Sequence, residues 1–173
     1  MRGLLHPLAQ PAHALALLAL GLLIGQQHAR RRPVLWATFI AGLAAGLSAI
    51  ALAVGQTPAA DVLLTAAGLA GILVAIGRPL PGLACALLAA VMGVALGLDS
   101  PPDAISIAAG TIMLIGTGLG ASLMLAIVVV GAGWLVGAQE RAMPRIGMRI
   151  LGSWVAASAM LVLALRFARG GLF

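Results

Sequence analysis

Short stretches that contain proline, arginine or acidic residues divide the sequence into six long apolar segments. An apolar helix needs about 20 residues to cross a lipid bilayer. Proline lacks a backbone donor and disfavours helix in the residue before it, so the prolines between the segments mark helix ends. We therefore predict membrane-spanning helices over residues 8–25, 34–55, 62–77, 82–98, 104–137 and 146–165.

The composition requires a lipid environment. Hydrophobic residues make up 62% of the 173 residues and charged residues only 8%, against about 45–50% and about 25% in soluble domains. A soluble fold of this length has too little interior to hide so much apolar surface. The predicted fold class is all-α, a polytopic membrane bundle of about six transmembrane helices that forms one domain over residues 1–173.

The fifth apolar segment, 104–137, is too long for a simple span. As one helix it would measure about 51 Å, whereas the hydrocarbon core is about 30 Å thick. Glycines at 110, 116, 118 and 120 crowd its first half, so either one tilted helix, with room for a kink, projects beyond the membrane or the segment breaks near residues 116–120. No polar loop lies there, which favours the single helix.

The basic residues predict how the chain is oriented. All ten are arginine, and aromatic residues make up only 3% of the chain, which argues against nucleic-acid binding. With both termini outside a bacterial inner membrane, the cytoplasmic side carries more arginines, as the positive-inside rule requires. The inner set is Arg30, Arg31, Arg32, Arg78, Arg141, Arg145 and Arg149, and the outer set is Arg2, Arg166 and Arg169.

Two histidines lie at the mouth of the first span. His6 and His13 are seven residues apart, close to two helical turns, so they would share one face of a helix. Imidazole binds nickel, cobalt, copper and zinc. The alternative is that His6 is solvated and His13 packs at a helix end. Cys85 is the only cysteine, which excludes an internal disulfide and a cysteine-rich metal site.

Two motifs resemble those of the HupE/UreJ family. His6, Pro7 and His13 align with its first-span pattern H-P-x-x-G-x-D-H, with Gln10 and Ala12 in place of the glycine and aspartate. A second pattern, roughly H-G-x-A-H-G-x-E-x-P, aligns with residues 92–101. There, Gly93, Ala95, Gly97 and Pro101 match, Asp99 replaces the glutamate, and Met92 and Leu96 replace the histidines. The resemblance implies a small multi-span permease for nickel or cobalt.

The candidate metal ligands are His6, His13, Asp99 and Met92. Cys85, Met92 and Asp99 are spaced by seven and would form one stripe on the fourth helix. Sulfur ligands would favour copper(I) over nickel, although Met and Cys also pack as ordinary apolar residues. His28 lies beside the arginine run and is expected to be part of a solvated loop.

Two functions remain open. The first is a divergent permease that moves a transition-metal cation (nickel, cobalt or copper) as its substrate. The second is an accessory or structural subunit of a larger membrane complex, favoured because no ionisable residue lies well inside a span. No catalytic set of side chains is recognisable, so we expect no enzyme and no tightly bound cofactor. The expected partners are the lipid bilayer and, left open, further copies of the chain or partner subunits.

Overall fold

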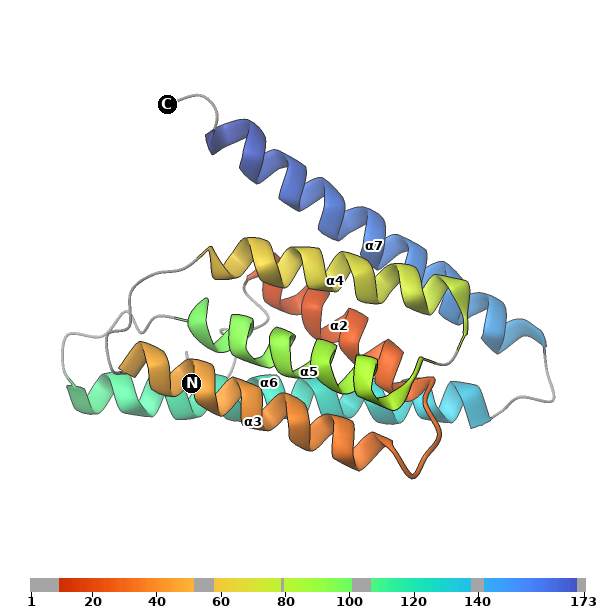
Figure 1. Ribbon diagram of the computed structural model, residues 1–173, viewed down its shortest axis with the longest axis horizontal. Helices are drawn as coiled ribbons and strands as arrows, with labels where there is room; N and C mark the ends of the chain where they lie inside the picture. The colour runs from red at the N-terminus through yellow and green to blue at the C-terminus, as the bar shows by residue number, and fades with distance from the viewer. Residues whose placement is uncertain (1–9, 52–57, 79, 101–106, 138–141, 171–173) are drawn as a thin grey trace.

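The computed structural model describes residues 10–51, 58–78, 80–100, 107–137 and 142–170. These residues form six helices and no strand, which confirms the all-α prediction (Figure 1). The helices are α2 (Pro11–Gly25), α3 (Arg32–Ala51), α4 (Ala59–Ile76), α5 (Gly82–Leu98), α6 (Ile107–Gly137) and α7 (Ala142–Gly170).

Proline and glycine set the helix ends, as the sequence predicts. Pro11 occupies the first turn of α2, where its missing N–H would have no partner in the helix. Pro58 and Pro81 directly precede α4 and α5. Gly77 ends α4 in the left-handed conformation, with φ of 71°, which glycine adopts without steric penalty.

The α6 helix is continuous over 31 residues, so the single-helix prediction is confirmed and the alternative break near residues 116–120 is wrong. In length and apolarity, α3, α4, α6 and α7 qualify as membrane spans within the described residues. The apolar helices α2 and α5 are shorter, at 15 and 17 residues. Residues 8 and 9 of the first predicted span lie outside the described part.

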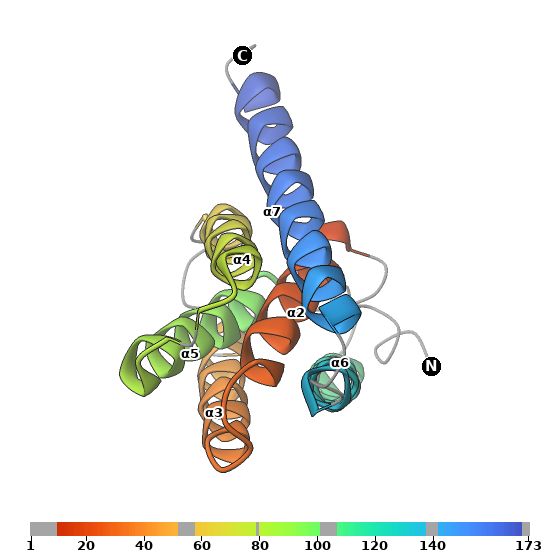
Figure 2. The ribbon, with the colours of Figure 1, turned by 90° about the vertical axis from the view of Figure 1, so that its right-hand side faces the viewer.

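The short helix α2 lies at the centre of the bundle. It contacts each of the other five helices, and ten of its fifteen residues are buried. Figure 2, which looks along the bundle, shows α3 and α5 on one side of α2, α6 on another, and α4 and α7 above. The apolar core consists mainly of Leu and Ala side chains around α2.

Successive helices run in opposite directions, so the helix termini lie at the two ends of the bundle (Figure 1). The polar residues near these termini therefore collect at the same two ends. We call one the histidine end, where α2 and α4 begin and α5 and α7 finish; it contains His13, Asp61, Asp99 and Arg166. We call the other the arginine end; its described members are Arg30, Arg31, Arg32, Arg78 and Arg149. This segregation agrees with the arginine distribution expected for a membrane protein.

Glycines let α3 and α5 approach very closely. Gly42 and Gly46 of α3 face Gly93 and Gly97 of α5, and a Cβ added to any of the four would collide with backbone atoms of the opposite helix. Small residues four apart commonly serve this purpose between membrane helices. Gly21 and Gly25, a further pair with this spacing, pack α2 against Val128 and Ala132 of α6.

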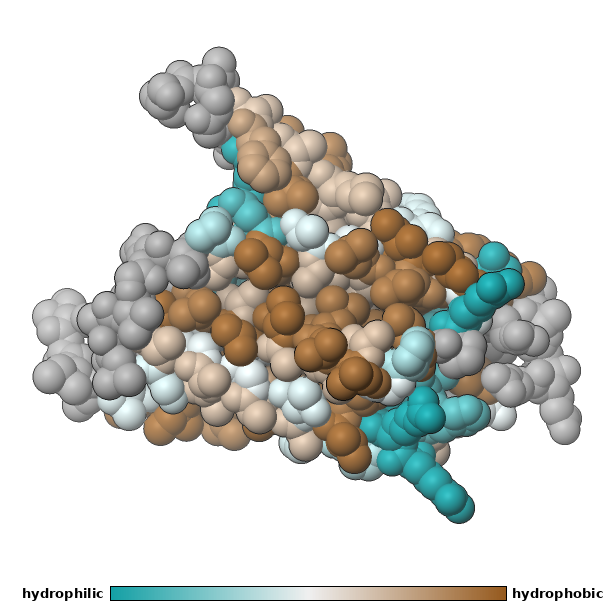
Figure 3. Space-filling model, in the orientation of Figure 1, coloured by the Kyte–Doolittle hydropathy of each residue, from teal (hydrophilic) through white to brown (hydrophobic). Residues whose placement is uncertain are grey.

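The outer surface of the bundle is apolar. Large apolar side chains on α6 and α7 are exposed, among them Ile127, Trp134, Trp154 and Leu161. Figure 3 shows a broad hydrophobic surface between hydrophilic groups toward the two ends. Soluble monomers rarely expose contiguous apolar patches of this extent. The protein is therefore a multi-pass membrane protein whose outward-facing side chains contact lipid.

Candidate metal site at the histidine end

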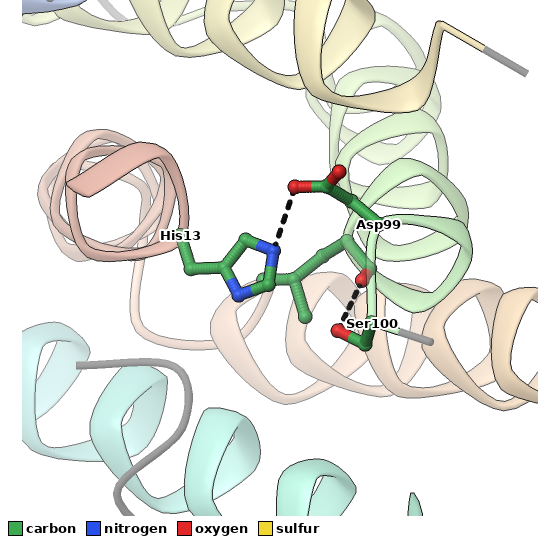
Figure 4. Close-up of polar contacts among 4 residues, drawn as sticks. His13, Asp99 and Ser100 are labelled. Atoms are coloured by element: carbon green, nitrogen blue, oxygen red, sulfur yellow. Dashed lines mark hydrogen bonds and ion pairs between the residues drawn. The ribbon is translucent and has the colours of Figure 1, made fainter. Parts of the chain in front are cut away.

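His13 and Asp99 form a partly buried pair at the histidine end. The Nε2 atom of His13 lies 3.0 Å from Oδ2 of Asp99, within hydrogen-bond distance (Figure 4). The His13 side chain is fully buried, whereas that of Asp99 is 23% exposed. The two residues are 86 positions apart in the sequence. The pair therefore joins the start of α2 to the end of α5.

Local structure places both side chains. Pro11 starts α2, so His13 falls in the first helical turn and projects into the bundle. Asp99 directly follows the last residue of α5, and its backbone N–H donates to the carbonyl of Ala95 at 2.9 Å. The buried Ser100 hydroxyl donates to the carbonyl of Leu96 at 2.7 Å. These bonds fix the chain where α5 ends and thus position the Asp99 carboxylate.

The other two predicted ligands are Met92 and His6, and the structure describes only Met92. Met92 lies two turns before Asp99 on the buried face of α5 and belongs to the apolar core, as does Cys85. His6 lies outside the described residues. Among the residues that are described, no group of three or more His, Cys, Asp or Glu side chains is close enough to hold a metal. His28 is exposed, as expected.

The second described acid at this end is already paired. Oδ1 of Asp61 accepts a hydrogen bond from Nε of Arg166 at 2.7 Å, which links α4 to the C-terminal part of α7. Both side chains are partly exposed to solvent. Of the described carboxylates, only that of Asp99 lies against an imidazole.

Sequence reasoning missed two buried polar residues. Ser100 is buried beside Asp99, and its position between the aspartate and the prolines at 101 and 102 is typical of a structured helix end. Gln27 is buried at the arginine end. The only sequence signal for Gln27 is the pair of glutamines that directly follows the apolar residues of α2.

The fold and the site define a helical multi-pass membrane protein with a histidine–carboxylate pair at one end of its central helix. Residues 1–163 match the family described as HupE / UreJ protein, and the chain belongs to this family. Comparisons with curated proteins and with solved structures give no match. Family membership suggests a role related to nickel or cobalt transport.

Proposed function

We propose that the protein is a permease for a transition-metal cation, nickel or cobalt, in the bacterial inner membrane. The observation that supports this most directly is the partly buried His13–Asp99 pair. Both residues fall in the stretches that resemble the family motifs. Imidazole is a suitable ligand for these cations, and a nearby carboxylate adds negative charge where the cation would arrive.

In this proposal, His13 binds the cation and Asp99 positions the imidazole. Metal-binding histidines commonly donate their other ring N–H to a carboxylate, which fixes the ring and raises its basicity. His6 supplies a second nitrogen, and the Met92 thioether is the next donor along α5, so that copper(I) is the alternative substrate. Both termini and the histidine end face the outside, which places the arginine end in the cytoplasm.

One observation favours the alternative, an accessory subunit that does not transport. Between the two ends, the core around α2 is built from apolar side chains. The buried polar residues in the described part are His13, Gln27, Ser100 and Thr117, and only Thr117 lies away from the helix ends. A cation that crosses the membrane usually meets polar or ionisable partners on its way.

Metal uptake in cells or proteoliposomes tests the proposal. Asp99→Asn should lower uptake of nickel or cobalt by about 10–100-fold, as loss of a group that supports a metal ligand does, and His13→Ala, which removes the ligand itself, should lower it by at least as much. His28→Ala is the matched control, because His28 is an exposed histidine at the other end. Protection of the buried Cys85 thiol verifies that each variant is folded.

Uptake that equals the wild-type rate in both site variants would rule out the site. Absence of uptake by the wild-type protein, together with a second polypeptide that always co-purifies, would favour the accessory subunit instead.

A further inference from the structure

A cavity of about 600 Å³ opens at the arginine end, where α2, α4 and α6 finish and α7 begins. This volume is in the range of small-molecule sites, about 300–1,000 Å³. Its polar lining includes Gln26, Gln27, Arg32 and Arg149. The described acids Asp61 and Asp99 are both at the histidine end, so within the described residues no carboxylate offsets the positive charge of this cavity.

Backbone carbonyls hold both arginines at the cavity. Nε of Arg32 donates to the carbonyl of Gln27, just after α2, at 3.0 Å. Nε of Arg149 donates to the carbonyl of Ala75, in the last turn of α4, at 2.8 Å. A guanidinium has five N–H donors in a rigid plane. Within the described residues, each arginine is therefore anchored through its Nε–H, which leaves the terminal N–H groups for another acceptor.

The side-chain amide of Gln27, buried at the same cavity, finds no hydrogen-bond partner among the described residues. The Gln27 residue is only 1% exposed, and neither its Nε2 nor its Oε1 finds a hydrogen-bond partner in the described part of the chain. Leaving such a group unsatisfied costs free energy, because its buried polar atoms have given up their hydrogen bonds to water. A ligand that accepts hydrogen bonds in the cavity would satisfy the Nε2 donor.

We propose that this cavity binds a phosphate group, carried either by free phosphate or by the headgroup of an anionic phospholipid. Two guanidinium groups and an amide N–H match the acceptor oxygens of phosphate, which arginine can bind through two parallel hydrogen bonds. The two guanidinium groups disfavour metal cations. Basic pockets between membrane helices on the cytoplasmic side are suited to anionic headgroups. The proposal does not depend on metal transport.

Calorimetric titration of the full chain in neutral detergent tests the site. The probes are inorganic phosphate, dihexanoyl phosphatidylglycerol and, as the zwitterionic comparison, dihexanoyl phosphatidylcholine. Saturable binding of phosphate identifies a site for the free anion. Binding of phosphatidylglycerol, with no binding of inorganic phosphate or phosphatidylcholine, identifies a site for an anionic headgroup. Binding of neither phosphate nor phosphatidylglycerol overturns the proposal.

Variants separate ligand binding from folding. Arg32→Gln and Arg149→Gln should each weaken binding about 10-fold or more, since hydrogen bonds to charged groups contribute strongly. Gln27→Leu should also weaken binding while leaving the protein at least as stable, because it removes an unsatisfied buried amide. Arg166→Gln, at the histidine end, should have no effect. An equal loss of affinity in Arg166→Gln would show nonspecific charge attraction and would overturn the site.

Discussion

The substitution Gly97→Ala should destabilise the protein by forcing α3 and α5 apart. A methyl group on Gly97 would lie 2.7 Å from the backbone nitrogen of Leu47 and 2.8 Å from the carbonyl carbon of Gly46. Non-bonded carbon atoms normally approach to about 3.5–4.0 Å, so the two backbones would have to separate by about 1 Å. Since the obstacles are helix backbone atoms, no side-chain rotation can relieve the overlap.

Overpacking of this kind costs about 1–3 kcal/mol, which corresponds to about a 5- to 140-fold loss in the folding equilibrium. Asp99 follows Gly97 by two residues, so a shift of α5 should also disturb the His13–Asp99 pair and reduce metal uptake. Equilibrium unfolding in mixed micelles, followed by circular dichroism, measures the loss of stability.

Gly131→Ala on α6 is the matched control. A Cβ at Gly131 would have no atom within 4 Å, and alanine is favoured over glycine inside a helix by about 0.5–1 kcal/mol. This variant should be at least as stable as the wild type. If Gly97→Ala unfolds at the same denaturant concentration as the wild type, the close α3–α5 contact inferred from these glycines is wrong.

Three further predictions concern the core and the orientation. The Cys85 thiol, which is fully buried, should resist maleimide in the folded protein and react only after denaturation; rapid labelling in the native state would contradict its position in the core. In a Cys85→Ala background, an impermeant maleimide added to intact cells should label Ala168→Cys but not Ala29→Cys. Labelling of Ala29→Cys but not Ala168→Cys would show that the orientation is opposite to the one proposed. Replacing the buried Met92 and Leu96 together by histidine should raise nickel affinity, measured by calorimetric titration. The same change should lower stability without metal, because two polar rings would then be buried. Unchanged nickel affinity would show that neither position faces the site.

Helix positions were predictable because their signals are local. Pro81 and Gly77 act on their own backbone and that of their immediate neighbours, so Gly77 ends α4 and Pro81 precedes the start of α5 for local reasons. The continuity of α6 likewise follows from the lack of a polar loop within it. The α3–α5 contact was harder to predict, because a chain with 23 glycines contains several pairs with the same spacing, and the sequence does not show which pairs meet.

The candidate site was predictable only in part. Because successive spans alternate in direction, the start of the first predicted span, with His13, and the end of the fourth, with Asp99, fall at the same end of the bundle; the structure brings the two side chains within 3.0 Å of each other. That contact depends on the packing of α2 against α5, which pairs residues from distant parts of the chain. The burial of Gln27 depends on where α4, α6 and α7 meet α2, and no local pattern encodes it.

The shortness of α2 and α5 affects the electrostatic barrier that an ion would experience. With 15 and 17 residues they rise only about 22 Å and 25 Å, against about 30 Å for the hydrocarbon core. The helices α6 and α7, which pack against α2, are longer, at 31 and 29 residues. Because an ion loses its hydration only across the dry part of its route, a route no longer than α2 would carry it through an apolar layer about a quarter thinner than the hydrocarbon core.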